Sequence, residues 1–191
     1  GLETSSAFDI NIIEKLYDQG LLPKDRFIIC NGFKRKEYIE NICRLVNTGF
    51  ENVIPVIDNK NELFEYRFKK NAKVKLGIRI AAEEEPTFEF YTSRLGIRYN
   101  DIVPYYRLYL KNHPNFELKM LHFFINTGIR DNAYYWSELA KAVNVYVELK
   151  RECPTLDSLN IGGGFPVRTS LNFDYDYQYM AEEILNQIKT I

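Results

Sequence analysis

The stretch from Leu156 to Pro166, LDSLNIGGGFP, places three consecutive glycines directly behind a short apolar run. A short apolar run is typical of a buried β-strand, and the glycines follow at its carboxyl end. Residues without a Cβ let the backbone approach a ligand closely, and their successive N–H groups can converge on one anion. The stretch therefore predicts an α/β protein whose backbone amides bind a phosphate at the end of a strand. The alternative is a turn with a purely structural role.

Strand-like and helix-like segments alternate along the rest of the chain. The strand-like segments are rich in Val, Ile, Leu and Phe with little polar alternation, as in strands buried on both faces. They cover Arg26–Cys30, Asn52–Ile57, Val74–Ile80, Leu118–Ile125 and Ser158–Ile161. The helix-like segments cover Ala7–Gln19, Lys36–Thr48, Asn61–Lys70, Asp101–Lys111, Asn132–Cys153 and Tyr175–Ile191. This order predicts a parallel sheet with helical crossovers, because parallel neighbours need long connections.

Two architectures fit such a sheet, a doubly wound sheet and a (β/α)8 barrel. In both, ligands bind at the carboxyl ends of the strands, where the glycine turn lies. The dinucleotide fingerprint Gly-x-Gly-x-x-Gly is not met, because Val167 stands where its last glycine belongs. The turn also follows the last predicted strand rather than the first. The pattern therefore disfavours a dinucleotide-binding fold.

Composition limits the classes of partner. The 191 residues include 25 Lys and Arg and 26 Asp and Glu, a formal net charge of −1 that indicates neither nucleic acid nor an anionic membrane. No apolar run approaches the roughly 20 residues that span a bilayer. The cysteines Cys30, Cys43 and Cys153 have no metal-ligand or disulfide spacing. We therefore expect a cytoplasmic, globular enzyme and assign none of its residues as metal ligands.

Six short motifs follow one another along the chain. They are GLETSS at 1–6, IICNGFK at 28–34, LGIRI at 76–80, SRLGI at 93–97, LHF at 121–123 and NIGGGF at 160–165. In this order and at plausible spacing, they resemble motifs of the biosynthetic arginine decarboxylases. These enzymes belong to the barrel-type pyridoxal 5'-phosphate (PLP) decarboxylases, alongside ornithine and diaminopimelate decarboxylases. The resemblance covers nearly the whole chain.

The resemblance implies a PLP-binding (β/α)8 TIM barrel followed by a β-rich C-terminal domain. Residues 1–191 would form an incomplete PLP-binding domain, a partial barrel from about strand two to the helix after strand seven. Strand one with the Schiff-base lysine, strand eight and the C-terminal domain would lie outside this chain. We therefore expect a piece of a larger protein that contains no catalytic residue and is inactive when isolated. Its exposed strand edges would favour self-association.

The resemblance also assigns residues to the cofactor phosphate and ring. Gly162, Gly163 and Gly164 match the phosphate loop, and Thr127 matches a hydroxyl residue that donates to the same phosphate. The alternative for Thr127 is an ordinary helix cap. The chain reads His-Phe-Phe at 122–124 where the family reads His-Phe-His. Phe124 would thus cover the pyridine ring in place of histidine, while His122 is either a hydrogen-bonded core residue or a cofactor contact.

Four further residues match family positions near the reacting end of the cofactor. Arg79 matches an arginine near the cofactor, and Glu3, its expected partner, matches an acidic residue beside the Schiff base. Alternatively, these two close the barrel rim as a salt bridge. Ser6 and Asp9 match a serine and a glutamate, and both also fit the first turn of a helix.

By this resemblance the parent protein decarboxylates arginine to agmatine in polyamine biosynthesis. It would act on a small-molecule amino acid and form a homo-oligomer. One alternative is a non-catalytic regulatory paralogue on the same barrel, which Phe124, Asp9 and the altered Asn126–Gly128 segment favour. The other is a different PLP barrel enzyme, such as an ornithine or diaminopimelate decarboxylase or a racemase.

Overall fold

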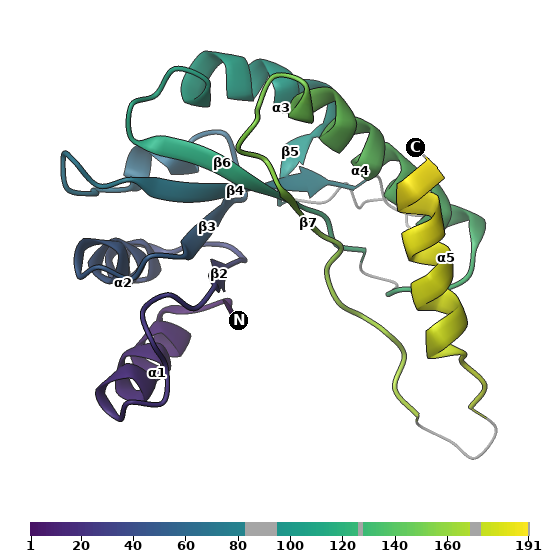
Figure 1. Cartoon of the computed structure of the whole chain (residues 1–191), viewed down its shortest axis with the longest axis horizontal. Helices are drawn as coiled ribbons and strands as arrows, with labels where there is room; N and C mark the ends of the chain where they lie inside the picture. Colours follow the sequence, from purple (N-terminus) through teal and green to yellow (C-terminus); the bar gives the residue numbers. More distant parts are fainter. Residues whose placement is uncertain (83–94, 126–127, 169–172, 191) are drawn as a thin grey trace.

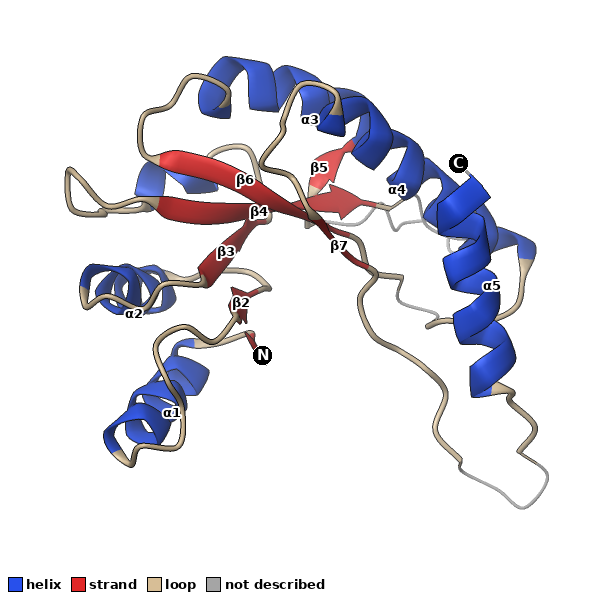
Figure 2. Ribbon diagram, viewed as in Figure 1, coloured by secondary structure: helices blue, strands red, loops and turns tan. Residues whose placement is uncertain are grey.

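A computed structural model describes residues 1–82, 95–125, 128–168 and 173–190. Its centre is a curled parallel sheet with helices packed on its outer face (Figures 1 and 2). The strands lie in the order β1 (Leu2–Thr4), β2 (Ile28–Cys30), β3 (Val53–Ile57), β4 (Val74–Ala81), β6 (Phe116–His122) and β7 (Ser158–Asn160), and the short β5 (Ile97–Arg98) pairs with β4. Every paired neighbour runs parallel. The predicted partial barrel is confirmed.

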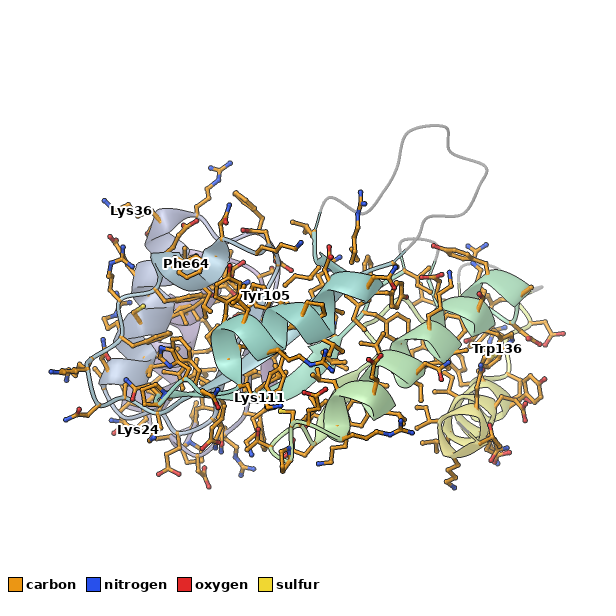
Figure 3. The ribbon with its side chains drawn as sticks, turned by 90° about the horizontal axis from the view of Figure 1, so that it is seen from above. Lys24, Lys36, Phe64, Tyr105, Lys111 and Trp136 are labelled. Carbon is orange, nitrogen blue, oxygen red and sulfur yellow. The ribbon has the colours of Figure 1, made fainter. Side chains whose placement is uncertain are left out.

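Helical segments connect the strands. They are α1 (Ala7–Asp18), α2 (Lys36–Asn47), the 3₁₀ turn η1 (Glu62–Glu65), α3 (Tyr99–Tyr105), the π-helical turn η2 (Tyr106–Leu110), α4 (Ala133–Lys150) and α5 (Tyr177–Thr190). Tyr105 of α3 and Trp136 of α4 lie in the layer of helices over the sheet (Figure 3). In the part of the chain that the structure describes, no helix combines the length and apolarity needed to cross a bilayer.

The sheet separates two apolar clusters. The larger one fills the space between the strands and the helices. The smaller one lies on the opposite, interior face of the curl and consists of Ile29, Ile54, Val56 and Met120. Because side chains alternate between the two faces of a strand, residues two positions further along also face the interior. The interior cluster thus identifies which residues at the strand ends point into the curl.

The helix predicted for Asn61–Lys70 is wrong beyond its first turn. Only Glu62–Glu65 is helical, and Tyr66 has extended backbone angles of φ −71° and ψ 141°. The Tyr66 ring stacks on Phe68 with centroids 5.2 Å apart, and its hydroxyl donates to Glu62 at 2.7 Å. Tertiary packing of aromatic side chains therefore overrides a helical pattern that is weak in this charged segment.

The strand predicted for Leu118–Ile125 begins earlier, at Phe116, and ends earlier, at His122. Its neighbour β7 ends at Asn160, which pairs with His122, and the chain then turns away at Gly162 with φ +74°. On the other side of β6, the next residues of β4, Ile80 and Ala81, pair with β5 instead, so the ladder of β6 ends at His122. The strand β1 is missing from the strand-like segments, because three residues are too short to show a pattern. It agrees with the expectation from the resemblance that the chain begins at about strand two of the barrel.

Candidate active site

A row of polar residues crosses the interior face at the carboxyl ends of three strands. Arg79 of β4 pairs in register with His122 of β6, which pairs with Asn160 of β7. Met120 lies two residues before His122 and belongs to the interior apolar cluster, so the whole row faces the interior. We call these strand ends, with the residues that directly follow them, the mouth of the half-barrel.

The first and last strands meet at the mouth through side chains. Glu3 of β1 lies beside Ile29, an interior residue of β2. Its carboxylate accepts hydrogen bonds from the Asn31 amide at 2.5 Å and the Asn160 amide at 3.4 Å. Glu3, on the edge strand β1, therefore contacts the opposite edge strand β7 through Asn160. Both of its hydrogen-bond donors are neutral amides.

The predicted pairing of Arg79 with Glu3 is wrong. The ion-pair partner of Arg79 is Asp58, whose Oδ1 lies 3.9 Å from Nη1. Asp58 directly follows β3, the immediate neighbour of β4, whereas Glu3 stands on β1 at the far edge of the sheet. The Arg79 guanidinium also lies over the ring of Phe124, 5.7 Å from its centroid, at a distance typical of a cation–π contact.

Buried polar atoms without hydrogen-bond partners concentrate at the mouth. Within the described residues, seven buried side-chain atoms lack such a partner. Five of them lie at the mouth: Asn31 Oδ1, both Asp58 carboxylate oxygens, Arg79 Nε and His122 Nδ1. Each such atom costs about 1–3 kcal/mol in a folded protein. This concentration is typical of a site that receives a polar ligand.

The glycine turn borders the mouth and leaves no room for a side chain at Gly162 or Gly164. Gly164 has φ +100°, and a Cβ on it would lie 2.8 Å from Gly128 Cα; a Cβ on Gly162 would lie 2.8 Å from the Phe123 carbonyl oxygen. The Gly162 N–H already donates to Asn160 Oδ1 at 2.8 Å. The predicted convergence of three amides on one anion thus reduces to Gly163 and Gly164, and phosphate binding there stays a prediction.

The turn is also tied to the segment after β6. Ile129 N–H donates to the Gly164 carbonyl at 3.0 Å. Phe124, half-buried at the end of β6, has its ring Cδ2 3.2 Å from the position of a Cβ on Gly162. Thr127 lies outside the described residues. The fold therefore places Phe124, the predicted contact of the cofactor ring, next to Gly162–Gly164, the predicted contacts of the phosphate.

Ser6 and Asp9 lie at the start of α1, as the helix alternative expected. Ser6 Oγ accepts from the Asp9 N–H at 3.4 Å, while Asp9 Oδ2 accepts from the Ser5 and Ser6 N–H groups at 2.8 and 3.0 Å. The Ser5 backbone bond is the main reason that the pKa of Asp9 is lowered. This reciprocal pattern is a capping box, so both side chains have a structural role.

Replacing Ser6 with alanine should destabilise the chain by about 1 kcal/mol, because the first turn of α1 loses its cap. Urea unfolding followed by circular dichroism measures this difference. The matched control is Ser5→Ala, because Ser5 Oγ lies 3.5 Å from Asp9 Oδ2. It should change the free energy of unfolding less. Equal effects of the two substitutions would contradict the capping role.

Three charged residues at the mouth were not among the predicted site residues. Lys34, Asp58 and Glu62 are buried, and the Lys34 ammonium lies 3.2 Å from Glu62 Oε1 and 3.6 Å from Asp58 Oδ2. Asp58 could have been found, since it is the first polar residue after the buried run VIPVI. Lys34 carries no such signal, because a lysine in a polar loop is usually exposed.

His122 is buried with an exposed fraction of 3%, as the core alternative expected. Burial is the largest cause that lowers its pKa, and the positive charge of Arg79 lowers it further. Glu3, Asp58 and a hydrogen bond with Asn160 act in the opposite direction. His122 is therefore neutral in the folded chain at pH 7.

Acidification below the ordinary histidine pKa of about 6.5 should lower the stability of the chain through His122. In that range the unfolded state binds a proton that folded His122 does not, so the free energy of unfolding falls as pH falls. The free energy of unfolding, measured with urea at pH 5.5, 6.5 and 7.5, should depend less on pH in His122→Gln than in the wild-type chain. The control His113→Gln alters an exposed histidine. An unchanged pH dependence in His122→Gln would contradict the expectation.

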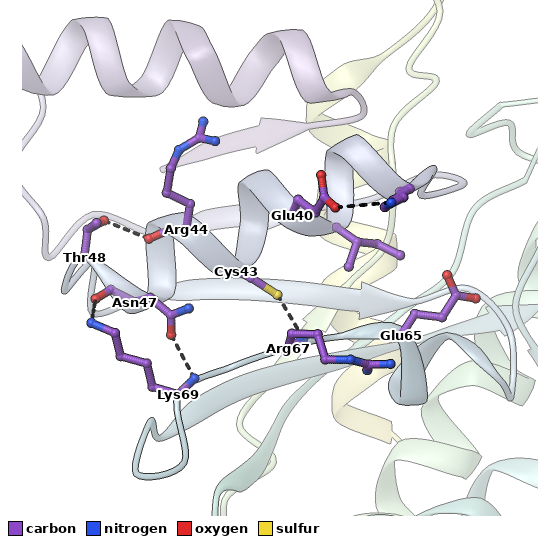
Figure 4. Close-up of a pocket in the computed structure, with 10 residues that line it drawn as sticks. Glu40, Cys43, Arg44, Asn47, Thr48, Glu65, Arg67 and Lys69 are labelled. Atoms are coloured by element: carbon purple, nitrogen blue, oxygen red, sulfur yellow. Dashed lines mark hydrogen bonds and ion pairs between the residues drawn. The ribbon is translucent and has the colours of Figure 1, made fainter.

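A hollow lies between α2 and residues 65–69, away from the mouth. It has a volume of about 570 Å³ and is drawn in Figure 4. Its cations already have partners: Arg44 binds Glu14, Lys69 donates to the Asn47 carbonyl, and Arg67 donates to two backbone carbonyls. The mouth, with its unpartnered buried atoms, is therefore the stronger candidate for the active site.

The curled parallel sheet, the glycine turn after β7 and the polar mouth define the ligand-binding part of a (β/α)8-barrel protein. The family model described as "pyridoxal-dependent decarboxylase, pyridoxal binding domain" matches residues 1–191, and the chain belongs to this family. PLP is the cofactor of that family.

Biosynthetic arginine decarboxylases are among the proteins with similar sequences. Biosynthetic arginine decarboxylase from Prochlorococcus marinus is 28% identical over 204 residues, which is 99% of this chain and 31% of that protein. Biosynthetic arginine decarboxylase 2 from Synechocystis sp. is 29% identical, over 98% of this chain and 31% of its own length. The chain thus spans about a third of the length of the curated relatives it matches.

Solved structures share the fold. The biosynthetic arginine decarboxylase SpeA from Campylobacter jejuni matches 99% of this chain and 32% of its own, with a TM-score of 0.67 and 25% identity. Diaminopimelate decarboxylase from Helicobacter pylori, complexed with L-lysine, has a TM-score of 0.68 and 16% identity over 100% of this chain and 48% of its own. At that identity the second match supports the fold alone.

Proposed function

We propose that the full-length protein containing this chain decarboxylates arginine to agmatine with PLP, as a step of polyamine biosynthesis. The observation that carries the proposal is the mouth, where unpartnered buried polar atoms adjoin the glycine turn. The arginine decarboxylases among the relatives support this substrate. The chain's part in this reaction is to bind and orient the cofactor.

The residues at the mouth fit PLP in charge and shape. The Gly163–Gly164 amides would donate to its phosphate, since a Cβ on Gly163 would meet no atom within 4 Å. The positive charge of Arg79 favours an anionic group in the same space. When bound, PLP accepts the electrons left by the departing carbon dioxide.

Other residues of the chain control the surroundings of the cofactor. Phe124 offers an aromatic face next to the glycine turn, which would exclude water from one side of a flat ring. Neutral His122 has an unpartnered Nδ1 that can exchange a hydrogen bond with a ligand. Glu3, held by two amides, places a carboxylate at the mouth where it favours a nearby cation.

The substrate test uses the full-length protein. We expect the absorbance of added PLP to shift on binding, and carbon dioxide to be released fastest from arginine among arginine, ornithine, lysine and diaminopimelate. The isolated 191-residue chain should release none, because none of its lysines matches the family's Schiff-base lysine. Faster turnover of another amino acid would favour the alternative PLP enzymes.

A non-catalytic regulatory protein is the second candidate. Phe124 favours this candidate, because it offers no imidazole at the position where the family has histidine. The Phe124 ring contacts Arg79 instead. Its test is the variant Phe124→His in the full-length protein. If the protein is an enzyme, both forms should turn over arginine; no turnover by either, with PLP bound, would favour the regulatory candidate. We further propose a cytoplasmic homo-oligomer, in which the three buried free cysteines would stay reduced.

A further inference from the structure

Four buried charges form a connected group at one side of the mouth. They are Lys34, Asp58, Glu62 and Arg79, whose side chains are exposed by 0%, 0%, 3% and 12%. Two cations balance two carboxylates. Arg79 is the most exposed member and is the one in the interior row with His122. We call this group the buried charge cluster.

Lys34 and Glu62 are held in place by several hydrogen bonds. The Lys34 ammonium donates to the Val56 carbonyl at 2.6 Å and to the Gly32 carbonyl at 3.0 Å. Glu62 accepts from the Asp58 N–H at 3.0 Å and from the Tyr66 hydroxyl at 2.7 Å. These two residues therefore form a fixed base for the cluster.

The Asp58 carboxylate differs from its neighbours. Within the described residues neither of its oxygens has a hydrogen-bond partner, and its ion contacts are 3.6 Å to Lys34 and 3.9 Å to Arg79. Replacing a buried ion pair with well-packed apolar side chains of similar volume is often neutral or stabilising. A contribution to stability therefore does not explain why a carboxylate is buried at position 58. Its position between the cations of Lys34 and Arg79 does explain it.

We propose that Asp58 is a positioning residue that holds the Arg79 guanidinium in the mouth, with Lys34 and Glu62 holding Asp58 in turn. Arg79 then lies over the Phe124 ring, which abuts Gly162, so the cluster orients a cation next to the phosphate turn. The proposal deepens the proposed function, but its first test needs no cofactor.

The first test measures the pKa of His122 by NMR in the full-length protein without PLP, with exposed His113 as internal reference. Arg79 lowers this pKa, while Asp58, Glu3 and Asn160 raise it. If Asp58 acted only through its own charge, Asp58→Asn would lower the pKa. If Asp58 holds Arg79 beside His122, the variant releases Arg79 and the pKa rises. A fall in the Asp58→Asn variant would overturn the proposal, and Asp58→Glu should restore the wild-type value.

The second test is a double-mutant cycle on PLP affinity in the full-length protein. Asp58→Asn and Arg79→Gln should each weaken binding about tenfold, the scale of one charge-assisted contact. Together they should weaken it no further than Arg79→Gln alone, because both remove the same contact. Additive losses would overturn the proposal. The control Asp101→Asn removes an exposed carboxylate that pairs with Lys60 and should leave affinity unchanged.

The two tests separate this inference from the proposed function. A wild-type protein that does not bind PLP would refute the function while the His122 measurement still decides the role of Asp58. Circular dichroism of each variant shows whether it folds. If Asp58→Asn does not fold, Asp58→Ser, which also removes the carboxylate, and the cycle between Asp58→Ser and Arg79→Gln provide the same comparison.

Discussion

Replacing Gly164 with alanine is expected to lower the affinity of the full-length protein for PLP by about tenfold or more and to destabilise the chain by about 2 kcal/mol. Gly164 has φ +100°, a conformation that residues with a Cβ rarely adopt, and the new Cβ would lie 2.8 Å from Gly128 Cα. The substitution must therefore shift the turn away from the segment after β6. PLP titration followed by absorbance, together with urea unfolding, measures both effects.

Gly163→Ala is the matched control for stability. Its Cβ would meet no atom within 4 Å, so we expect the free energy of unfolding to change by no more than about 0.5 kcal/mol. If the cofactor occupies the open space into which this Cβ would point, a loss of affinity with unchanged stability is the expected result for this variant. Equal stability losses in the two variants would contradict the role of backbone conformation at Gly164.

Replacing Lys34 with methionine should destabilise the chain by about 3–5 kcal/mol, the range for breaking a buried ion pair by removing one partner. The variant leaves Asp58 and Glu62 buried with no cation between them, and it leaves the Val56 carbonyl without its side-chain donor. Thermal or urea unfolding at pH 7 measures the loss.

Lys60→Met gives the matched control, because Lys60 is 56% exposed in its pair with Asp101. Exposed ion pairs contribute about 0–1 kcal/mol, so a small change is expected. A Lys34→Met variant as stable as Lys60→Met would show that the buried charge cluster does not support the fold. Adding Glu62→Gln to Lys34→Met should recover part of the loss, since it removes one unpaired carboxylate.

Much of the fold could be predicted, because buried parallel strands have a continuous apolar pattern. The segments at Asn52–Ile57 and Val74–Ile80 agree with β3 and β4 to within one residue at each end. The glycine turn follows the last strand, β7, as the sequence predicted, whereas the positive φ angles of Gly162 and Gly164 are a finding of the structure. The helix at 61–70 failed because the Tyr66–Phe68 stack is a tertiary contact that no local pattern shows.

The candidate site was predicted less completely, for a related reason. Residues that directly follow a strand, such as Asp58 and Asn31, can be expected at the mouth from strand order alone. Which charges pair there depends on the order of strands around the curl. Asp58 lies beside Arg79 because β3 neighbours β4, whereas the expected partner Glu3 stands on a strand three places away. Lys34 stayed hidden because its burial comes from packing across β2, β3 and η1.

A crystal structure of the full-length protein with bound PLP tests the central claim most directly. The account predicts the phosphate within hydrogen-bond distance of the Gly163 and Gly164 amides, with the ring near Phe124 and the mouth residues Arg79 and His122. A phosphate bound elsewhere, with the glycine turn contacting no ligand, would contradict it.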